Sequence, residues 1–270
     1  MQDYASTIER EFRSRGAITS KELASVLGVS QPTISRLLDR FEKGRILQMG
    51  QGRRSRYALA RNLSTLGSSW PLYEIDQDGR AQAMGQLHAL AGRHWCLQQD
   101  TPWESLRGSD FQDGLYPGLP WFLDDLRPQG FLGRVFARTY GLTLGLPADP
   151  RDWQSDDVLL SLIRQGQDLP GSFVLGNAML AIVQARMLAS TGEAISAANR
   201  FAVYPKRADS ILGGEWSGSS AGGEQPKFTA LVCDEEGTAR HVLVKFSGRA
   251  GRSEDKRWGD LLAAEHTAKT

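Results

Sequence analysis

The chain has 270 residues and a net charge of +1, with 40% hydrophobic and 23% charged residues. This length allows one large domain or two to three small ones, and the composition is that of a globular protein with a hydrophobic core. The near-neutral charge excludes a chain that coats nucleic acid along its whole length, so a basic surface has to be local. Two distant cysteines and the lack of a membrane-length apolar run lead us to expect a cytoplasmic protein with no disulfide framework and no membrane partner.

The first 61 residues have the pattern of three short helices followed by a hairpin. Ile8 and Phe12 are four residues apart on the first helix. Thr19 or Ser20 is the expected N-cap of the second helix, and Ser30 is that of the third. The predicted inward positions of the second and third helices are Leu23, Val26, Leu27, Ile34, Leu37, Leu38 and Phe41. Residues 46–49 and 57–59 read as two strands joined by the tip "GQGRRS", which is the layout of a winged helix-turn-helix.

Charge in this segment favours DNA as the partner. Residues 1–61 hold twelve Lys/Arg against six Asp/Glu, a local charge of +6, while the remaining residues hold 20 and 25 and carry −5. The third helix would present polar groups to base edges, and the arginine-tipped hairpin would meet phosphates. An alternative is a small dimerisation or docking module. The predicted DNA-binding residues are Gln31, Thr33, Ser35, Arg36, Arg53, Arg54 and Arg56.

Residues 62–205 read as a linker, a small sheet and several helices. A hairpin with its turn at Asp78-Gly79 is followed by a strand near residue 95. Helices are expected within 115–142, 154–166 with Ser155 as cap, and 176–190. His88, His94 and Cys96 match no common zinc spacing, so no metal site is predicted. The expected core of the first of these helices is Trp121, Phe122, Leu126, Phe131, Leu132, Val135 and Phe136.

The last segment begins with the glycine-rich stretch "GSSAGGEQPKFTALV". Two strands follow, and in the second Val242, Val244 and Phe246 share one face while Lys245 points to the other. A final helix carries Glu265, with Leu261, Leu262 and His266 on its expected packing side. This order of loop, strands and helix is what the N-lobe of a nucleotide-binding kinase needs. The N–H groups of a glycine-rich loop can approach phosphate oxygens closely. A lysine on the strand neutralises the phosphates, and a glutamate on the helix holds the lysine in place. The alternative is an ordinary turn with a surface lysine.

Three motifs carry a resemblance to a known family. The loop "SSAGGEQPKFTAL" resembles the glycine-rich loop of HipA-type serine/threonine kinases, the toxins of bacterial type II toxin–antitoxin systems. "LPWFLDDLRPQGFLGR" resembles that family's "LP-x-F-x-x-x-L-P-x-G" segment, and "VLVKFSG" resembles its nucleotide-lysine strand. The resemblance covers about residues 70–270, and the fused helix-turn-helix is similar to the YjjJ branch. It implies an α+β chain of three parts: a winged helix-turn-helix over 1–61, a HipA N-terminal-like subdomain over 62–205, and a kinase N-lobe portion over 206–270.

The resemblance also implies roles for individual residues. Ser220 would be an inhibitory autophosphorylation site, with Ser217 and Ser219 as alternatives, because a phosphate there places negative charge where those of ATP belong. Implied cofactors are ATP and Mg²⁺, and implied partners are DNA, an aminoacyl-tRNA synthetase as protein substrate, an antitoxin and a second copy of the chain. The implied ATP-binding residues are Gly222, Gly223, Gln225, Lys227, Lys245 and Glu265.

One departure from the family limits the expected activity. A kinase also needs a catalytic Asp and metal-binding Asn and Asp residues, which this family carries in an Asp-Gly-His-x-Lys-Asn type loop and a later Asp. Only 25 residues follow Lys245, and they contain no such loop. We therefore expect a truncated kinase that does not transfer phosphate by itself, with no catalytic residue of its own. The alternative is a winged-helix transcription regulator whose remaining residues dimerise or sense a ligand.

Overall fold

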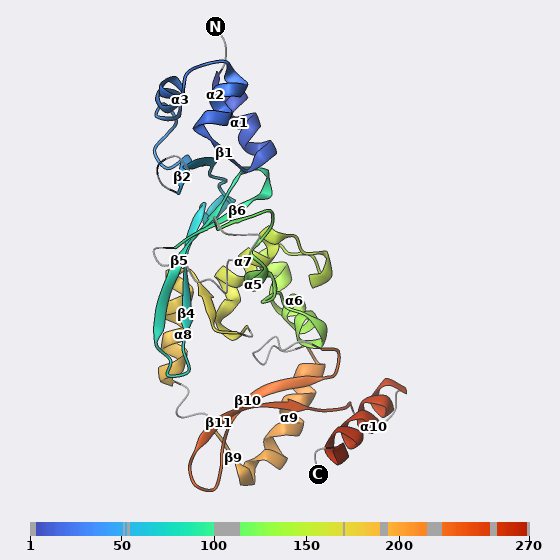
Figure 1. The fold of residues 1–270 in the computed structure, drawn as a ribbon. Helices are drawn as coiled ribbons and strands as arrows, with labels where there is room; N and C mark the ends of the chain where they lie inside the picture. The colour runs from blue at the N-terminus through green and yellow to red at the C-terminus, as the bar shows by residue number, and fades with distance from the viewer. Residues whose placement is uncertain are drawn as a thin grey trace. The chain divides into compact units, whose positions relative to one another are not determined.

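The computed structural model describes residues 4–50, 52, 55–99, 114–169, 171–189, 194–214, 223–248 and 253–268. Within them the fold is α+β, as predicted, with helices and three separate sheets (Figure 1). The chain divides into two compact units. The first holds residues 1–75, 81–124 and 175–177, and the second holds 76–80, 125–174 and 178–270.

The first unit begins with three helices and a small sheet. The elements are α1 (Tyr4–Arg15), β1 (Ala17–Thr19), α2 (Ser20–Leu27), α3 (Gln31–Leu38), β2 (Ile46–Met49) and β3 (Arg56–Leu59). The two predicted strands pair in register from Ile46↔Leu59 to Met49↔Arg56. The unpredicted β1 adds a third strand, so the sheet order is β1-β3-β2. Thr19 is the N-cap of α2 and forms a capping box with Glu22, which satisfies backbone N–H groups that the helix cannot pair itself.

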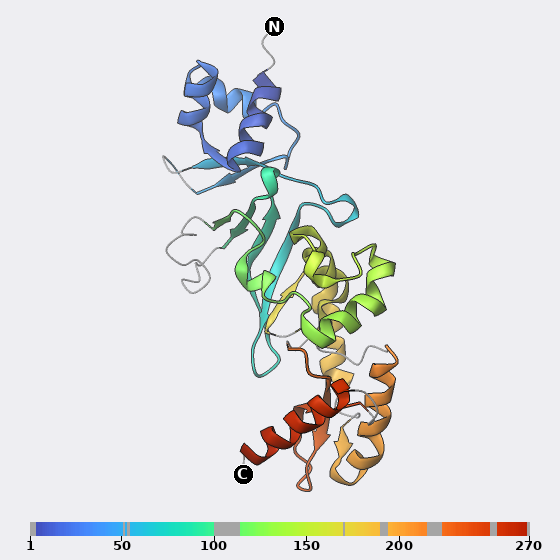
Figure 2. The ribbon, with the colours of Figure 1, turned by 90° about the vertical axis from the view of Figure 1, so that its right-hand side faces the viewer.

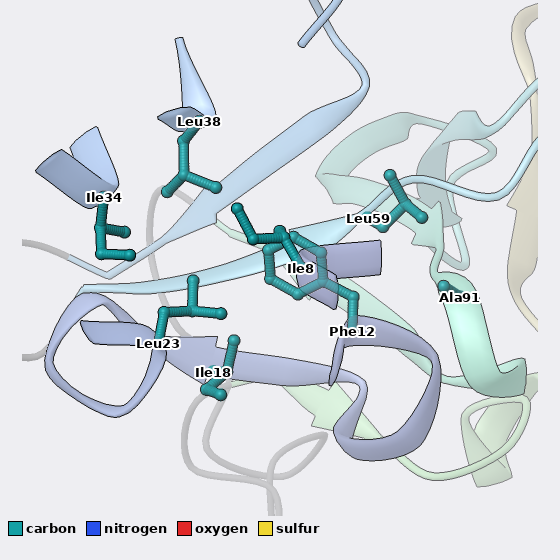
Figure 3. Packing of buried hydrophobic residues seen from close by; sticks show 8 residues of the cluster. All are labelled: Ile8, Phe12, Ile18, Leu23, Ile34, Leu38, Leu59 and Ala91. Atoms are coloured by element: carbon teal, nitrogen blue, oxygen red, sulfur yellow. The ribbon is translucent and has the colours of Figure 1, made fainter. Parts of the chain in front are cut away.

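The core of this amino-terminal region joins all its elements. Figure 3 shows eight of its buried residues: Ile8, Phe12, Ile18, Leu23, Ile34, Leu38, Leu59 and Ala91. Leu27, Leu37 and Phe41 pack against them, as predicted. Val26 was expected in the apolar stripe of α2, but it is exposed and Ala24 takes the inward position. Ala91 follows a strand of the next sheet, so the core extends past the boundary expected after residue 61.

The second sheet is built on the predicted hairpin. It contains β4 (Ser69–Ile75), β5 (Ala81–Ala89), β6 (Trp95–Gln98), β7 (Leu115–Tyr116) and β8 (Phe173–Leu175), in the order β7-β6-β5-β4-β8. The turn between β4 and β5 has Gly79 in a left-handed conformation. The neighbouring short helix α5 (Trp121–Asp124) buries Phe122 and Leu123, whereas Trp121, expected in the core, is exposed.

The second unit contains the longer helices. α6 (Gly130–Leu144) is separated from α5 because Pro128 interrupts the single helix that we expected within 115–142. α7 (Ser155–Gln165) has Gln154 as its N-cap, one residue before the expected Ser155, and the Gln154 N–H donates to Asp157 at 2.8 Å. α8 (Asn177–Ala189) is a helix as predicted, but its apolar residues Ile182, Met187 and Leu188 are exposed.

The carboxy-terminal part of the second unit is a small sheet between two helices. It contains β9 (Ile195–Ser196), α9 (Arg200–Leu212), β10 (Lys227–Cys233), β11 (Ala239–Lys245) and α10 (Ser253–Ala268), with strand order β11-β10-β9. Figure 2 shows α9 in orange and α10 in red on opposite sides of these strands. The α9 side is apolar: Phe228, Val232 and Ile211 are buried there. Val242, Val244 and Phe246 pack on the same side, which confirms the predicted face.

Candidate functional site

Lys245 at the end of β11 contacts Glu265 of α10. Its Nζ donates to both carboxylate oxygens of Glu265, at 2.6 and 2.7 Å. With 32% and 34% of their side-chain surfaces exposed, the two residues form a pair that stabilises the fold by at most about 1 kcal/mol. The main effect of the pair is to hold the ammonium group in one place. The sequence predicted these two residues as partners, and the structure brings them together.

Lys227 lies directly opposite Lys245 in the sheet. The two are cross-strand partners in the antiparallel register of β10 and β11, so their side chains share one face. Lys227 is only 4% exposed. Burial, and next the charge of Lys245, lower the pKa of Lys227, while Glu224 acts in the opposite direction. Two ammonium groups that repel each other on one face create a strong local preference for an anion.

The end of the glycine-rich segment lies against Lys227. Gly223 has φ +97°, and a Cβ at this position would be 2.9 Å from the Nζ of Lys227. The left-handed φ favours glycine here, and the backbone passes beside the ammonium at the end of the flexible Lys227 side chain. Pro226 accepts a hydrogen bond from the Phe246 N–H at 3.0 Å, which fixes the loop end next to Lys245. The Nε2 of Gln225 is buried and has no hydrogen-bond partner among the described residues.

Four of the residues expected at a phosphate therefore lie on one side of the β10–β11 ladder: Gly223, Lys227, Lys245 and Glu265. Gln225 is in the same loop. Chemically, this arrangement offers positive charge and a side-chain-free backbone to an anionic ligand. Gly222, Ser217, Ser219 and Ser220 lie outside the described residues.

Three of the residues expected at DNA are exposed on the first unit. Gln31, Ser35 and Arg36 are exposed on α3, and the Oγ1 of Thr33 is 2.9 Å from the Oγ of Ser30. Arg56 is not at the hairpin tip but starts β3, and its guanidinium donates to the Ala17 carbonyl at 3.2 Å. Arg53 and Arg54 lie outside the described residues.

The histidines and the cysteine of the second sheet have structural contacts. His88 faces Cys96 across β5 and β6 and has its Nε2 3.0 Å from Gln98 Oε1. Burial lowers the pKa of His88. Among the described residues, no three or more His, Cys, Asp or Glu side chains are grouped so that they could hold a metal ion. No described helix combines the length and the apolar character that a membrane crossing requires.

The contact of α6 with the loop was not predicted from the sequence. Gly130 and Arg134 reach Gly223 and Glu224, although only packing was expected of this helix. The available signal was the Pro128-x-Gly130 pattern, because a glycine two residues after a proline, at the start of a helix, marks a special backbone position. The role of such a position depends on a partner far away in the sequence.

Comparisons with known proteins bear on the identity of the chain. Residues 66–184 match the family model described as "YjjJ-like toxin, middle domain". The chain is 36% identical over 254 residues to the protein named "Toxin YjjJ" from Escherichia coli (strain K12). This match covers 94% of the chain and 54% of that protein, so the chain spans about half the length of the curated relative. No solved structure matches the chain significantly. The comparisons therefore support a relationship to the YjjJ-like toxin family.

Proposed function

We propose that the chain is the nucleotide- and DNA-binding portion of a HipA-like, YjjJ-type toxin with serine/threonine kinase chemistry. The observation that carries this proposal is the Lys245–Glu265 pair beside Gly223 and Lys227. In phosphoryl transfer the protein mainly positions the phosphates and neutralises their charge. Lys245 would bind ATP phosphates, Glu265 would orient Lys245, and Lys227 would add charge from the neighbouring strand.

The remaining parts of the reaction are assigned by resemblance. Mg²⁺ would neutralise phosphate charge, and no described cluster of acidic residues fits it. A protein serine, in an aminoacyl-tRNA synthetase, would be the acceptor, and Ser220 would be the site of self-modification. An antitoxin and a second copy of the chain are the proposed protein partners.

The amino-terminal region would bind DNA as a winged helix-turn-helix. α3 would enter the major groove, because its exposed Gln31, Ser35 and Arg36 carry the groups that contact base edges and phosphates. The hairpin between β2 and β3 would contact the backbone of the duplex. Linking a nucleotide site to a DNA-binding region would place the toxin at its own control sequence.

Nucleotide binding is the direct test of this proposal. We expect the chain to bind ATP in a calorimetric titration, and Lys245→Met to weaken binding at least tenfold, which is about 1.4 kcal/mol. Lys206→Met is the matched control, because it removes the same charge from an exposed position of α9 on the other side of the sheet. Affinity for ATP should be unchanged in this control. Absence of ATP binding by the unmodified chain would exclude the kinase assignment and favour a transcription regulator.

A further inference from the structure

The first turn of α6 is bonded to the backbone of the glycine-rich segment. The N–H of Phe131, near the helix start, donates to the carbonyl of Gly223 at 3.0 Å. The N-cap residue Gln129 forms no side-chain capping bond. Since the first N–H groups of a helix have no partner inside it, the loop carbonyl acts as a cap for α6. The helix and the loop therefore stabilise each other's position.

Gly130 makes this close approach sterically allowed. Its φ is +61°, and a Cβ there would lie 2.4 Å from the Gly223 carbonyl oxygen and 2.7 Å from the carbonyl carbon. Real Cβ atoms do not approach backbone this closely, and backbone atoms on both sides cannot move as a side chain can. The loop therefore passes through the space that a side chain at residue 130 would occupy.

An ion pair one turn further along α6 adds a contact with the next loop residue. The Arg134 guanidinium is 2.7 Å from the Glu224 carboxylate. The hydrogen bond from Arg134 is the largest cause that holds the pKa of Glu224 below its usual range. Both side chains are about half exposed, so the pair contributes little stability but does orient the loop.

The same turn of α6 also contacts the strand that carries the nucleotide lysine. The ring of Phe131 packs edge-on against that of Phe246, with centroids 6.2 Å apart. Phe246 directly follows Lys245, and its N–H donates to Pro226 of the loop. One helical turn therefore fixes both the loop and the end of β11.

We propose that Gly130, Phe131 and Arg134 form a clamp that positions the glycine-rich loop for the phosphate groups of a nucleotide. These are positioning residues, because they act through Gly223, Glu224 and Phe246. The inference rests on the proposed nucleotide-binding function. A loop that is held before the ligand arrives loses less conformational freedom on binding, so loosening the clamp lowers affinity for phosphate-bearing ligands. Contacts with the base and ribose do not depend on the clamp.

The test compares two glycines at opposite ends of α6. Gly130→Ala and Gly145→Ala both place an alanine at a left-handed position, with φ +61° and +68°, but only residue 130 meets another backbone. Binding of ATP and of adenosine is titrated for both variants, and amide hydrogen exchange is followed over residues 223–227 without nucleotide. We expect Gly130→Ala to weaken ATP binding about tenfold, to change adenosine binding less than twofold, and to speed loop exchange. Gly145→Ala should change none of these.

A charge reversal keeps the test informative if Gly130→Ala does not fold. Arg134→Glu should weaken ATP binding several-fold, and adding Glu224→Arg should restore it. The clamp would be overturned if the two glycine variants had equal ATP affinities and equal loop exchange. It would also be overturned if adding Glu224→Arg to Arg134→Glu did not restore ATP affinity. If the unmodified chain binds no ATP, the nucleotide function is excluded. The clamp is then tested by hydrogen exchange alone: faster exchange over residues 223–227 in Gly130→Ala than in Gly145→Ala supports it, and equal exchange excludes it.

Discussion

Lys227 shows how one buried residue links the fold to the proposed chemistry. A lysine at the start of β10 is almost completely buried, yet it faces a second lysine across the ladder. Burial of an ammonium group is costly, and a like charge directly opposite adds to the cost. Such costs are typical of sites that bind a charged ligand, because the ligand compensates them when it arrives.

The burial of Lys227 predicts a specific pH dependence of stability. The pKa of Lys227 in the folded chain lies below the ordinary value of 10.5. At a pH between the folded pKa and 10.5, the unfolded chain therefore binds more protons than the folded chain. The free energy of unfolding therefore rises with pH as the pH approaches 10.5, by less than about 1.4 kcal/mol per pH unit. Lys227→Met should stabilise the chain near pH 7 and remove this rise, as measured by urea unfolding at several pH values.

Lys206→Met provides the comparison for this measurement. Lys206 is exposed on α9, so Lys206→Met should leave the rise with pH intact. An identical pH dependence in Lys227→Met and in the unmodified chain would show that Lys227 is already accommodated in its charged form.

At the scale of single elements, α3 presents exposed polar residues, whereas the arginine that begins β3 forms a contact within the fold. Ile34 and Leu38 are buried, while Gln31, Ser35 and Arg36 are on the outer side of α3. Arg56 differs from these because its guanidinium is bonded to the Ala17 carbonyl and ties β3 to β1. Arg36 is therefore available at the surface, whereas Arg56 also stabilises the sheet.

This division predicts different outcomes for two arginine substitutions. Arg36→Ala should weaken DNA binding, reduce the salt slope by about 1, and leave the free energy of unfolding unchanged. Arg56→Ala should also lower the free energy of unfolding, by about 1 kcal/mol, because a partly buried hydrogen bond is lost. DNA affinity at several salt concentrations and urea unfolding measure these effects.

Arg80→Ala is the control for general charge, since Arg80 is exposed in the β4–β5 turn. It should affect neither measurement. If Arg36→Ala matched Arg80→Ala in DNA affinity and salt slope, α3 would not be a DNA-contacting helix, and a docking function would be favoured.

Sequence patterns predicted most elements but not every boundary or face. The stripe of α2 was ambiguous because Leu23 and Leu27 are flanked by Val26 on one side and Ala24 on the other. Only the packing of the neighbouring helices selects Ala24. α9 was not predicted, and Pro205 inside it is a residue that disfavours a helix interior. Its burial of Ile211 against β10 outweighs this local preference.

At the scale of the whole molecule, the compact units do not follow the expected boundaries at residues 61 and 205. The amino-terminal region shares two buried clusters with the β5–β6 region. Leu90 and Cys96 pack with Ala17 and Ala58, and the N–H of Arg61 donates to the Ala89 carbonyl. We therefore expect the proposed DNA-binding region and the second sheet to unfold together.

A glycine substitution at the contact between these regions tests this expectation. Gly16 has φ +71°, and a Cβ there would meet the ring of His94 at 2.5 Å. Gly16→Ala should destabilise by more than the roughly 1 kcal/mol that a left-handed alanine costs, and speed hydrogen exchange in both residues 4–50 and 69–98. Gly28→Ala, with φ +64° and open space, should show only the smaller cost. Faster exchange confined to residues 4–50 would instead indicate an independent domain.

The pairing of Lys245 with Glu265 was predicted from the order of glycine-rich loop, lysine strand and helix, and not from a local pattern. Local sequence patterns were enough to specify most helices and strands, the hairpins and the basic amino-terminal segment. These depend on caps, periodicity and turn residues, which act over a few neighbouring positions. Long-range packing alone established that Lys227 is buried opposite Lys245, that α6 contacts the glycine-rich loop, and that the first 61 residues share a core with the next sheet. Each of these depends on contacts between residues far apart in the chain. A local pattern such as Pro128-x-Gly130 can mark a special position but cannot identify its distant partner.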